Sequence, residues 1–211
     1  LIKEIDHLKQ MTLKMGELVV DNLKVAMDIY YHYDPKKAEL INDNIVDLNE
    51  RLIEEMSLNI MLRERPFAKD LRTVSGILKL VEDIERLGDH AEDIKEFANK
   101  LIDVDHHNIP TLDESYKEPI KMVLDSILSF VNSDIKLAQE IIKNDDKVDN
   151  LYNQTIQYII DKTIDNTFSP SFSVYTTLVS KYIERIADHA VNIAEWVIYI
   201  ENGFHKDKQI F

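Results

Sequence analysis

The sequence has no cysteine, and it has only four glycines and five prolines among 211 residues. Without cysteine, disulfide bonds and thiolate metal sites are excluded, and the composition fits a reducing compartment. Glycine and proline are the strongest breakers of regular structure, so their scarcity favours long helices with few turns. No apolar run approaches the roughly 20 residues of a transmembrane helix, so we expect no direct insertion into a membrane.

The start of the chain shows no recognisable targeting segment. No charged, apolar and small-residue regions follow one another after Leu1 as they would in a signal peptide. The first residue is not Met, so the sequence leaves open whether further residues precede Leu1.

Positively charged residues are also few: the chain has 25 Lys and Arg against 39 Asp and Glu, and its net charge is -14. Sequence-independent binding of DNA or RNA needs a basic surface, so we expect no nucleic-acid partner. Catalytic signatures are missing too: there is no Gly-rich phosphate loop, no G-x-S-x-G and no paired Glu-x-x-His motif. We therefore expect a protein that is not an enzyme.

What the sequence does contain is apolar periodicity near 3.6 residues along most of its length, with no β-type alternation. The pattern predicts an all-α fold of six long antiparallel helices, arranged as two tandem three-helix-bundle repeats related by a pseudo-twofold axis. We expect the first repeat over residues 1–106 and the second over 107–211. The expected helices span about 1–32, 35–65, 68–103, a fourth from 111 or Pro119 to about 143, 145–166 and 170–202.

One stretch occurs twice. Ile84–Phe97 (IERLGDHAEDIKEF) returns as Ile183–Trp196 (IERIADHAVNIAEW) at an offset of 99 residues, with 8 of 14 positions identical. A second match, Asp43–Asp47 with Asp145–Asp149, lies upstream at an offset of 102. Matched segments at a fixed period indicate a repeated structural unit.

Both repeated segments contain two acidic residues four positions apart, which lie side by side on one face of a helix. The chain therefore has four acidic pairs in two symmetric sets: Asp43/Asp47, Glu85/Asp89, Asp145/Asp149 and Glu184/Asp188. With 39 acidic residues, single pairs at this spacing arise by chance, so the information lies in their recurrence at matched positions.

Like charges at this spacing destabilise a helix by about 0.2–0.5 kcal/mol, so we expect such a cluster only where a cation binds or a partner recognises it. Carboxylates are hard ligands suited to Mg, Mn, Ca or oxidised Fe. One hypothesis is a metal site on each repeat, with more than one ion, built by these eight residues from its second and third helices. The alternative is a set of solvated or Arg- and Lys-paired acidic faces, and the spacing alone leaves both open.

Several neighbouring residues bear on these sites. His90 and His189 follow the Asp of each motif and are expected to pack rather than to bind metal. Arg86 and Arg185 follow the Glu, and we expect ion pairs across helices rather than phosphate binding. The two sets also differ, because Glu50 matches Tyr152 and Asp93 matches Asn192.

The twin segments ERLGDHA and ERIADHAVNIAE resemble the paired signatures of the PhoU family of phosphate-transport accessory proteins. Further similarity lies in Pro66–Arg72 (PFAKDLR), in Val46–Glu50 (VDLNE) and in the closing Tyr199–Gly203 (YIENG), so it covers nearly the whole chain.

This resemblance implies a cytoplasmic homodimer that negatively regulates phosphate uptake and phosphate-starvation signalling. The implied partners are the ATPase subunit of the phosphate ABC transporter and a phosphate-sensing histidine kinase, between which the protein would act as an adaptor. Some family members have metal clusters at an acidic-x-x-x-Asp motif, which implies divalent or trivalent ions here (Fe, Mn, Zn or Mg) at the eight acidic residues. Two other functions remain open: metal buffering or storage, and regulation of another carrier such as a sodium/phosphate cotransporter.

Overall fold

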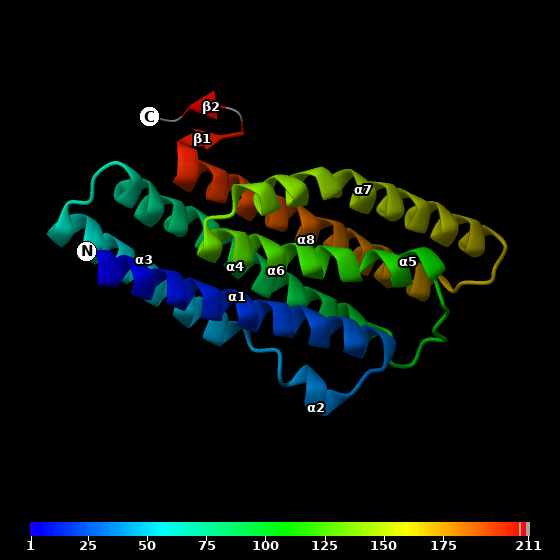
Figure 1. Ribbon diagram of the computed structural model, residues 1–211. Coiled ribbons are helices and arrows are strands. Elements are labelled where there is room, and N and C mark those ends of the chain that lie inside the picture. Colours follow the sequence, from blue (N-terminus) through cyan, green and yellow to red (C-terminus); the bar gives the residue numbers. More distant parts are fainter. Residues whose placement is uncertain (207, 210–211) are drawn as a thin grey trace.

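The computed structural model describes residues 1–206 and 208–209. Within this part of the chain there are six long helices, two short ones and a small hairpin (Figure 1). The helices are α1 (Ile2–Tyr31), α2 (Pro35–Ala38), α3 (Asp43–Glu64), α4 (Lys69–Lys100), α5 (Pro110–Ser115), α6 (Lys117–Asn132), α7 (Ile135–Ile164) and α8 (Pro170–Asn202). Two short antiparallel strands, β1 (Phe204–His205) and β2 (Lys208–Gln209), follow α8.

The predicted all-α fold is confirmed, with two corrections to the helix boundaries. The expected helix 35–65 is divided: Asp34 caps only the single turn of α2, and Asn42 caps α3 through its side chain. The expected break near residue 144 is absent, and α6 instead ends at Ser133, which adopts a left-handed conformation with φ 54°. Asp134 then accepts a hydrogen bond from the Leu137 backbone N–H and begins α7, which is the ordinary role of Asp at a helix N-terminus.

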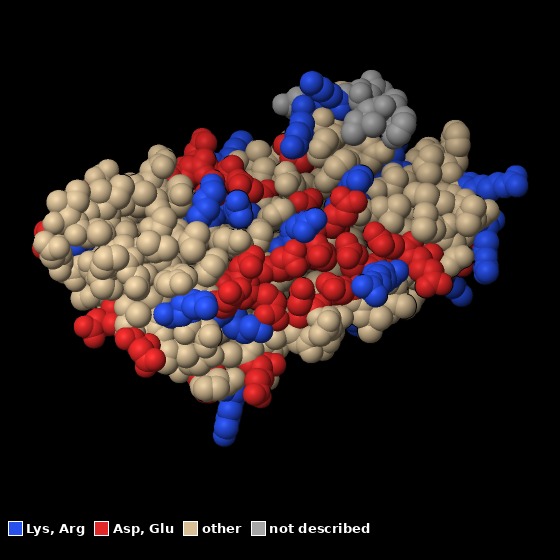
Figure 2. Space-filling view, turned by 180° about the vertical axis from the view of Figure 1, so that it is seen from behind, with Lys and Arg blue, Asp and Glu red and all other residues tan. Residues whose placement is uncertain are grey.

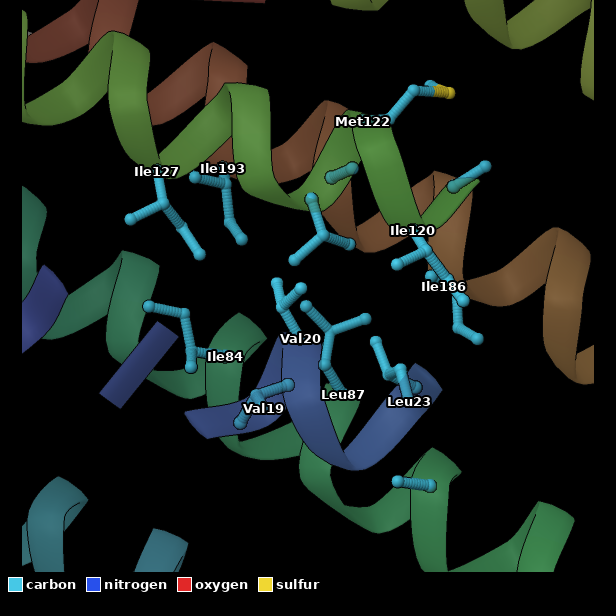
Figure 3. Packing of buried hydrophobic residues seen from close by; sticks show 14 of the residues in the cluster. Val19, Val20, Leu23, Ile84, Leu87, Ile120, Met122, Ile127, Ile186 and Ile193 are labelled. Carbon is cyan, nitrogen blue, oxygen red and sulfur yellow. The ribbon is translucent and has the colours of Figure 1, made fainter. Parts of the chain in front are cut away.

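Two helices, α4 and α8, lie at the centre of the bundle. α4 packs against α1 and α3, α8 packs against α6 and α7, and α4 and α8 pack against each other. Figure 3 shows apolar side chains from α1, α4, α6 and α8 meeting between the two halves, among them Val20, Leu87, Ile127 and Ile193. The buried residues of both repeats therefore form one continuous hydrophobic core.

Glycine permits the closest contacts between helices. A Cβ atom added at Gly76 of α4 would lie 2.4 Å from Ile200 Cγ1 of α8, well inside van der Waals distance. The glycine therefore sets how closely the two central helices approach. None of the described helices is long and apolar enough to cross a membrane.

We expect Gly76→Ala to destabilise the protein, although alanine is the better helix former. Overpacking of a tight core costs about 1–3 kcal/mol, which exceeds the roughly 1 kcal/mol gained in helix propensity. Urea unfolding followed by circular dichroism measures this difference. The double variant Gly76→Ala/Ile200→Ala should lose less unfolding free energy than the two single variants lose together, because truncation of Ile200 makes room for the new methyl group. Simple additivity would show that the close contact is not the cause.

Candidate metal centres

The eight acidic residues predicted from the repeat lie on four helices that pack in pairs. Asp43 and Asp47 occupy the first turns of α3, Glu85 and Asp89 lie in the middle of α4, and the two helices are in contact. We call these four residues the first acidic cluster. The second acidic cluster is formed in the same way on α7 and α8, which also pack together, by Asp145, Asp149, Glu184 and Asp188. Figure 2 shows acidic side chains gathered in a band across the back of the molecule, with scattered Lys and Arg.

Close packing of α3 on α4 brings the first cluster together. A Cβ atom at Gly88 would lie 3.0 Å from Val46 Cγ1 and 3.2 Å from Asp43 Oδ1. The backbone of α4 therefore lies directly against the first turn of α3, one residue before Asp89. At the matching positions of the second repeat, Ala187 and Val148 are both buried. In each repeat the core contact lies beside the acidic residues, so apolar packing fixes where the carboxylates stand.

The carboxylates of the first cluster repel one another. Burial raises the pKa of Asp43 to about 6, and the negative charges of Asp47, Asp89 and Glu85 add to the effect. Burial and the charge of Asp89 raise the pKa of Glu85 as well, although Arg86 partly opposes the change. A raised pKa means that the charged form of the carboxyl is disfavoured in this environment.

The second cluster has the same electrostatic character. Burial raises the pKa of Asp145 to about 6, with further contributions from the charges of Asp149 and Asp188. The pKa of Asp188 is also raised, first by burial and then by the nearby Glu184 and Asp149. Within each cluster the largest rise in pKa is at matched positions, Asp43 at the start of α3 and Asp145 in α7.

Two buried carboxylate oxygens have no hydrogen-bond partner among the described residues, and they too are a matched pair: Asp43 Oδ1 and Asp145 Oδ1. An unpaired buried acceptor is costly, and a hard cation would satisfy it. The donor types and the charge therefore fit such an ion. In the residues that the structure describes, however, no three His, Asp or Glu side chains converge as a set of metal ligands. Binding of an ion would require rotation of the carboxylate side chains.

The two clusters differ in the residues around them. Beside the first, burial and the charge of Glu85 raise the pKa of Glu50 to about 7. In the second, the matching residue is Tyr152, and Lys181 Nζ lies 5.2 Å from the centre of its ring. The same Lys181 donates to Glu184 at 2.5 Å. The second cluster thus contains a cation of its own. Lys181 was missed in the sequence, although the offset of 99 that aligns the motifs matches it to Glu82.

Arg86 and Arg185 do not make the predicted ion pairs across helices within the part of the chain that the structure describes. Arg86 lies 3.3 Å from Asp89, which is one turn away on the same helix and therefore within reach, and 3.7 Å from its sequence neighbour Glu85. Arg185 lies over the ring of Tyr182, at 5.2 Å from its centre.

The two histidines are packed between the repeats, in agreement with the prediction. Their rings lie 5.1 Å apart. His189 Nδ1 is hydrogen-bonded to Asp83 Oδ1 at 2.8 Å. The buried ring nitrogens of His90 have no hydrogen-bond partner among the described residues, and Asp93 Oδ2 lies 3.9 Å from Nδ1. Burial lowers the pKa of His90 to about 3, so this ring is neutral at physiological pH.

Comparison with known proteins gives a consistent result. The family model described as "PhoU domain" matches the chain twice, over residues 12–98 and 116–197. A phosphate-specific transport system accessory protein PhoU homolog from Aquifex aeolicus is 35% identical over 96% of this chain and 93% of its own length. A homolog of the same description from Clostridium acetobutylicum is 30% identical over 97% of this chain and 95% of its own length.

Solved structures are similar over the same extent. The crystal structure of PhoU from Pseudomonas aeruginosa matches with a TM-score of 0.90 at 28% identity, over 96% of this chain and 99% of that one. The phosphate transport system regulatory protein PhoU from Streptococcus pneumoniae matches with a TM-score of 0.89 at 26% identity, over 97% and 98% of the two chains.

We expect the metal-free protein to become less stable as the pH rises. Asp43 and Asp145 have pKa values of about 6 in the folded state against 3.8 ordinarily, so the folded state binds protons more tightly than the unfolded chain. The stability present at pH 4 is therefore lost as the pH passes through about 6. Asp43→Asn/Asp145→Asn should raise the free energy of unfolding at pH 8 by about 1 kcal/mol per site, after allowance for solvent screening.

Urea unfolding in EDTA at pH 4 and pH 8 measures both effects. Asp21→Asn is the matched control, because Asp21 is an exposed carboxylate of α1 outside both clusters. If Asp43→Asn/Asp145→Asn gained the same unfolding free energy at pH 4 as at pH 8, the electrostatic account of the clusters would be contradicted.

Proposed function

The chain belongs to the PhoU family, and from this membership we propose that it regulates phosphate transport as a metal-binding adaptor. Its role in phosphate transport follows from full-length relatives described as accessory proteins of the phosphate-specific transport system. The observation that carries the metal-binding part is the matched pair of acidic clusters, each with an unpartnered buried carboxylate oxygen at the same position.

The proposed regulation is negative: the protein limits phosphate uptake and phosphate-starvation signalling while phosphate is sufficient. The proposed partners are the ATPase subunit of the phosphate ABC transporter and the phosphate-sensing histidine kinase. We further propose that it works in the cytoplasm as a homodimer. The absence of catalytic motifs and the family's description as an accessory protein support a regulatory rather than an enzymatic role.

The two acidic clusters would supply the docking face. A bound divalent or trivalent cation (Fe, Mn, Zn or Mg) contributes positive charge that offsets the repulsion among the carboxylates. Asp43 and Asp145 would hold it through their unpartnered oxygens, with the other carboxylates of each cluster turning toward it. The remaining acidic band then attracts a basic surface of the partner, which speeds association and makes it sensitive to salt.

Elemental analysis of the natively purified protein tests the metal-binding part. We expect several metal ions per chain in the wild type and few in Asp89→Ala/Asp188→Ala, since each change removes one carboxylate from a cluster. Asp21→Ala, which removes a carboxylate outside both clusters, should retain the wild-type content. A metal-free wild type, or an unchanged content in the double variant, would refute metal binding at these positions.

Binding to the purified ATPase subunit tests the adaptor role. We expect the affinity to fall by about tenfold or more when salt is raised from about 50 to about 500 mM, because charges exposed at an interface are screened. The variant Asp89→Ala/Asp188→Ala should also bind more weakly, and cells that contain it should take up phosphate under conditions in which the wild type limits uptake. Affinity that is independent of both salt and the acidic pairs would contradict docking through this face.

A further inference from the structure

A hollow of about 460 Å³ lies between the last turns of α1 and the junction of α5 with α6, and none of the eight cluster acids lines it. These helices lie on the side of the bundle that faces the viewer in Figure 1, whereas Figure 2 shows the acidic band from behind. Small-molecule sites in proteins measure about 300–1,000 Å³. The hollow is therefore large enough for a ligand that contains a ring system.

The hollow lies where a proline interrupts the first helix of the second repeat. Pro119 has no backbone N–H and cannot donate the helical hydrogen bond to the carbonyl of Ser115, which is the last residue of α5. The first helix of the other repeat, α1, is unbroken from Ile2 to Tyr31. At the break, Tyr116 and Lys117 stand beside α1, and both line the hollow.

One wall of the hollow is aromatic. The rings of Tyr31 and Tyr116 both line it, and their centroids are 5.7 Å apart. The Tyr31 hydroxyl donates to Asp113 Oδ1 at 2.5 Å, and this hydrogen bond joins α1 to α5. Met27 and Ile120, both buried, complete the apolar part of the lining. A flat ring of a ligand would pack against this wall, because aromatic side chains provide large and rigid contact surfaces.

The unpaired charges on the lining of the hollow are positive. Its two acids have partners: Asp28 pairs with Lys37 at 2.5 Å, and Asp113 accepts the tyrosine hydroxyl described above. Lys24 and Lys117 are exposed, and neither forms an ion pair within the part of the chain that the structure describes. Two unpaired lysines beside one hollow, in a chain whose net charge is -14, favour an anionic ligand.

The same two lysines also line a second hollow of about 280 Å³ between α1 and α6. Lys121 lines this smaller hollow as well and pairs with Asp125 at 2.6 Å. Because both hollows share Lys24 and Lys117, an anionic group held by these lysines can extend the organic part of its molecule into the larger, aromatic hollow. A phosphate group joined to a flat ring has this combination of properties.

We propose that the larger hollow binds a nucleotide. The phosphate groups lie at Lys24 and Lys117, and the base packs against Tyr31 and Tyr116. The amide of Asn108, on the same lining, offers a donor and an acceptor to the edge of the base. Since the chain has no Gly-rich phosphate loop, side chains hold the phosphates, and we expect binding without hydrolysis. The inference goes beyond the proposed function and does not depend on metal binding.

Isothermal titration calorimetry of the full chain with ADP, in EDTA and at about 50 mM salt to limit charge screening, tests the proposal. EDTA prevents a metal ion at the acidic clusters from holding the phosphates. We expect a dissociation constant below about 1 mM, and one at least about tenfold higher for Lys24→Ala/Lys117→Ala. Lys14→Ala/Lys136→Ala is the matched control, because it removes two exposed lysines that line neither hollow, and it should bind ADP as the wild type does. No binding by the wild type, or equal losses in the two variants, would overturn the proposal.

Two smaller ligands and one further variant test the contact with the base. Adenosine and inorganic phosphate each make only part of the proposed contacts, so each should bind at least about tenfold more weakly than ADP. Tyr116→Leu should weaken the binding of ADP but not that of inorganic phosphate, since it removes a ring and no charge. If inorganic phosphate bound as tightly as ADP, or if Tyr116→Leu left the affinity for ADP unchanged, the hollow would not be a nucleotide site. All of these titrations are made without metal, so their outcome is independent of the test of the acidic clusters.

Discussion

The close packing of α3 on α4 and of α7 on α8 is the constraint on which the functional surface depends. Apolar contacts at Val46 and Gly88 hold the first turn of α3 against the middle of α4, and the acids beside these contacts are brought together with them. The hydrophobic core thus holds like charges close to one another, and the raised pKa values of Asp43 and Asp145 are the consequence. We propose that the protein maintains these clusters because a cation binds there.

The two repeats share a fold and one continuous core, but their surfaces have diverged. Glu50 beside the first cluster corresponds to Tyr152, and Glu82 corresponds to Lys181, which pairs with Glu184. Each cluster therefore has one cation from its own repeat: Arg86 contacts Asp89 and Glu85 in the first, and Lys181 contacts Glu184 in the second. The outward faces have diverged in part, because Leu48 and Leu52 of α3 match the polar Asn150 and Gln154 of α7. Exposed Leu62 of α3, in contrast, matches the exposed Ile164 of α7. Pseudo-symmetry makes such differences visible, because each repeat serves as the reference for the other.

Much of this could be predicted from the sequence, since the repeat identified matched acids and apolar periodicity identified helices. The turn at Ser133 and Asp134 could not be separated from a helix interior by periodicity, because apolar residues continue on both sides of it. Asp134 is a residue type that favours the start of a helix, but the continuous apolar periodicity around it indicated no break. Lys181 could not be found from residues that are identical in the two repeats, because the first repeat has Glu82 at the matching position. The role of the eight acids as metal ligands stays a prediction.

The most direct test of the central claim is a crystal of the protein soaked in Mn²⁺ and examined by anomalous scattering. Our account predicts anomalous peaks at both clusters, one beside Asp43 and one beside Asp145, with the surrounding carboxylates turned toward each ion. The absence of a peak at either cluster, with Mn²⁺ at saturating concentration, would contradict the account and leave the acidic band as a docking surface without metal.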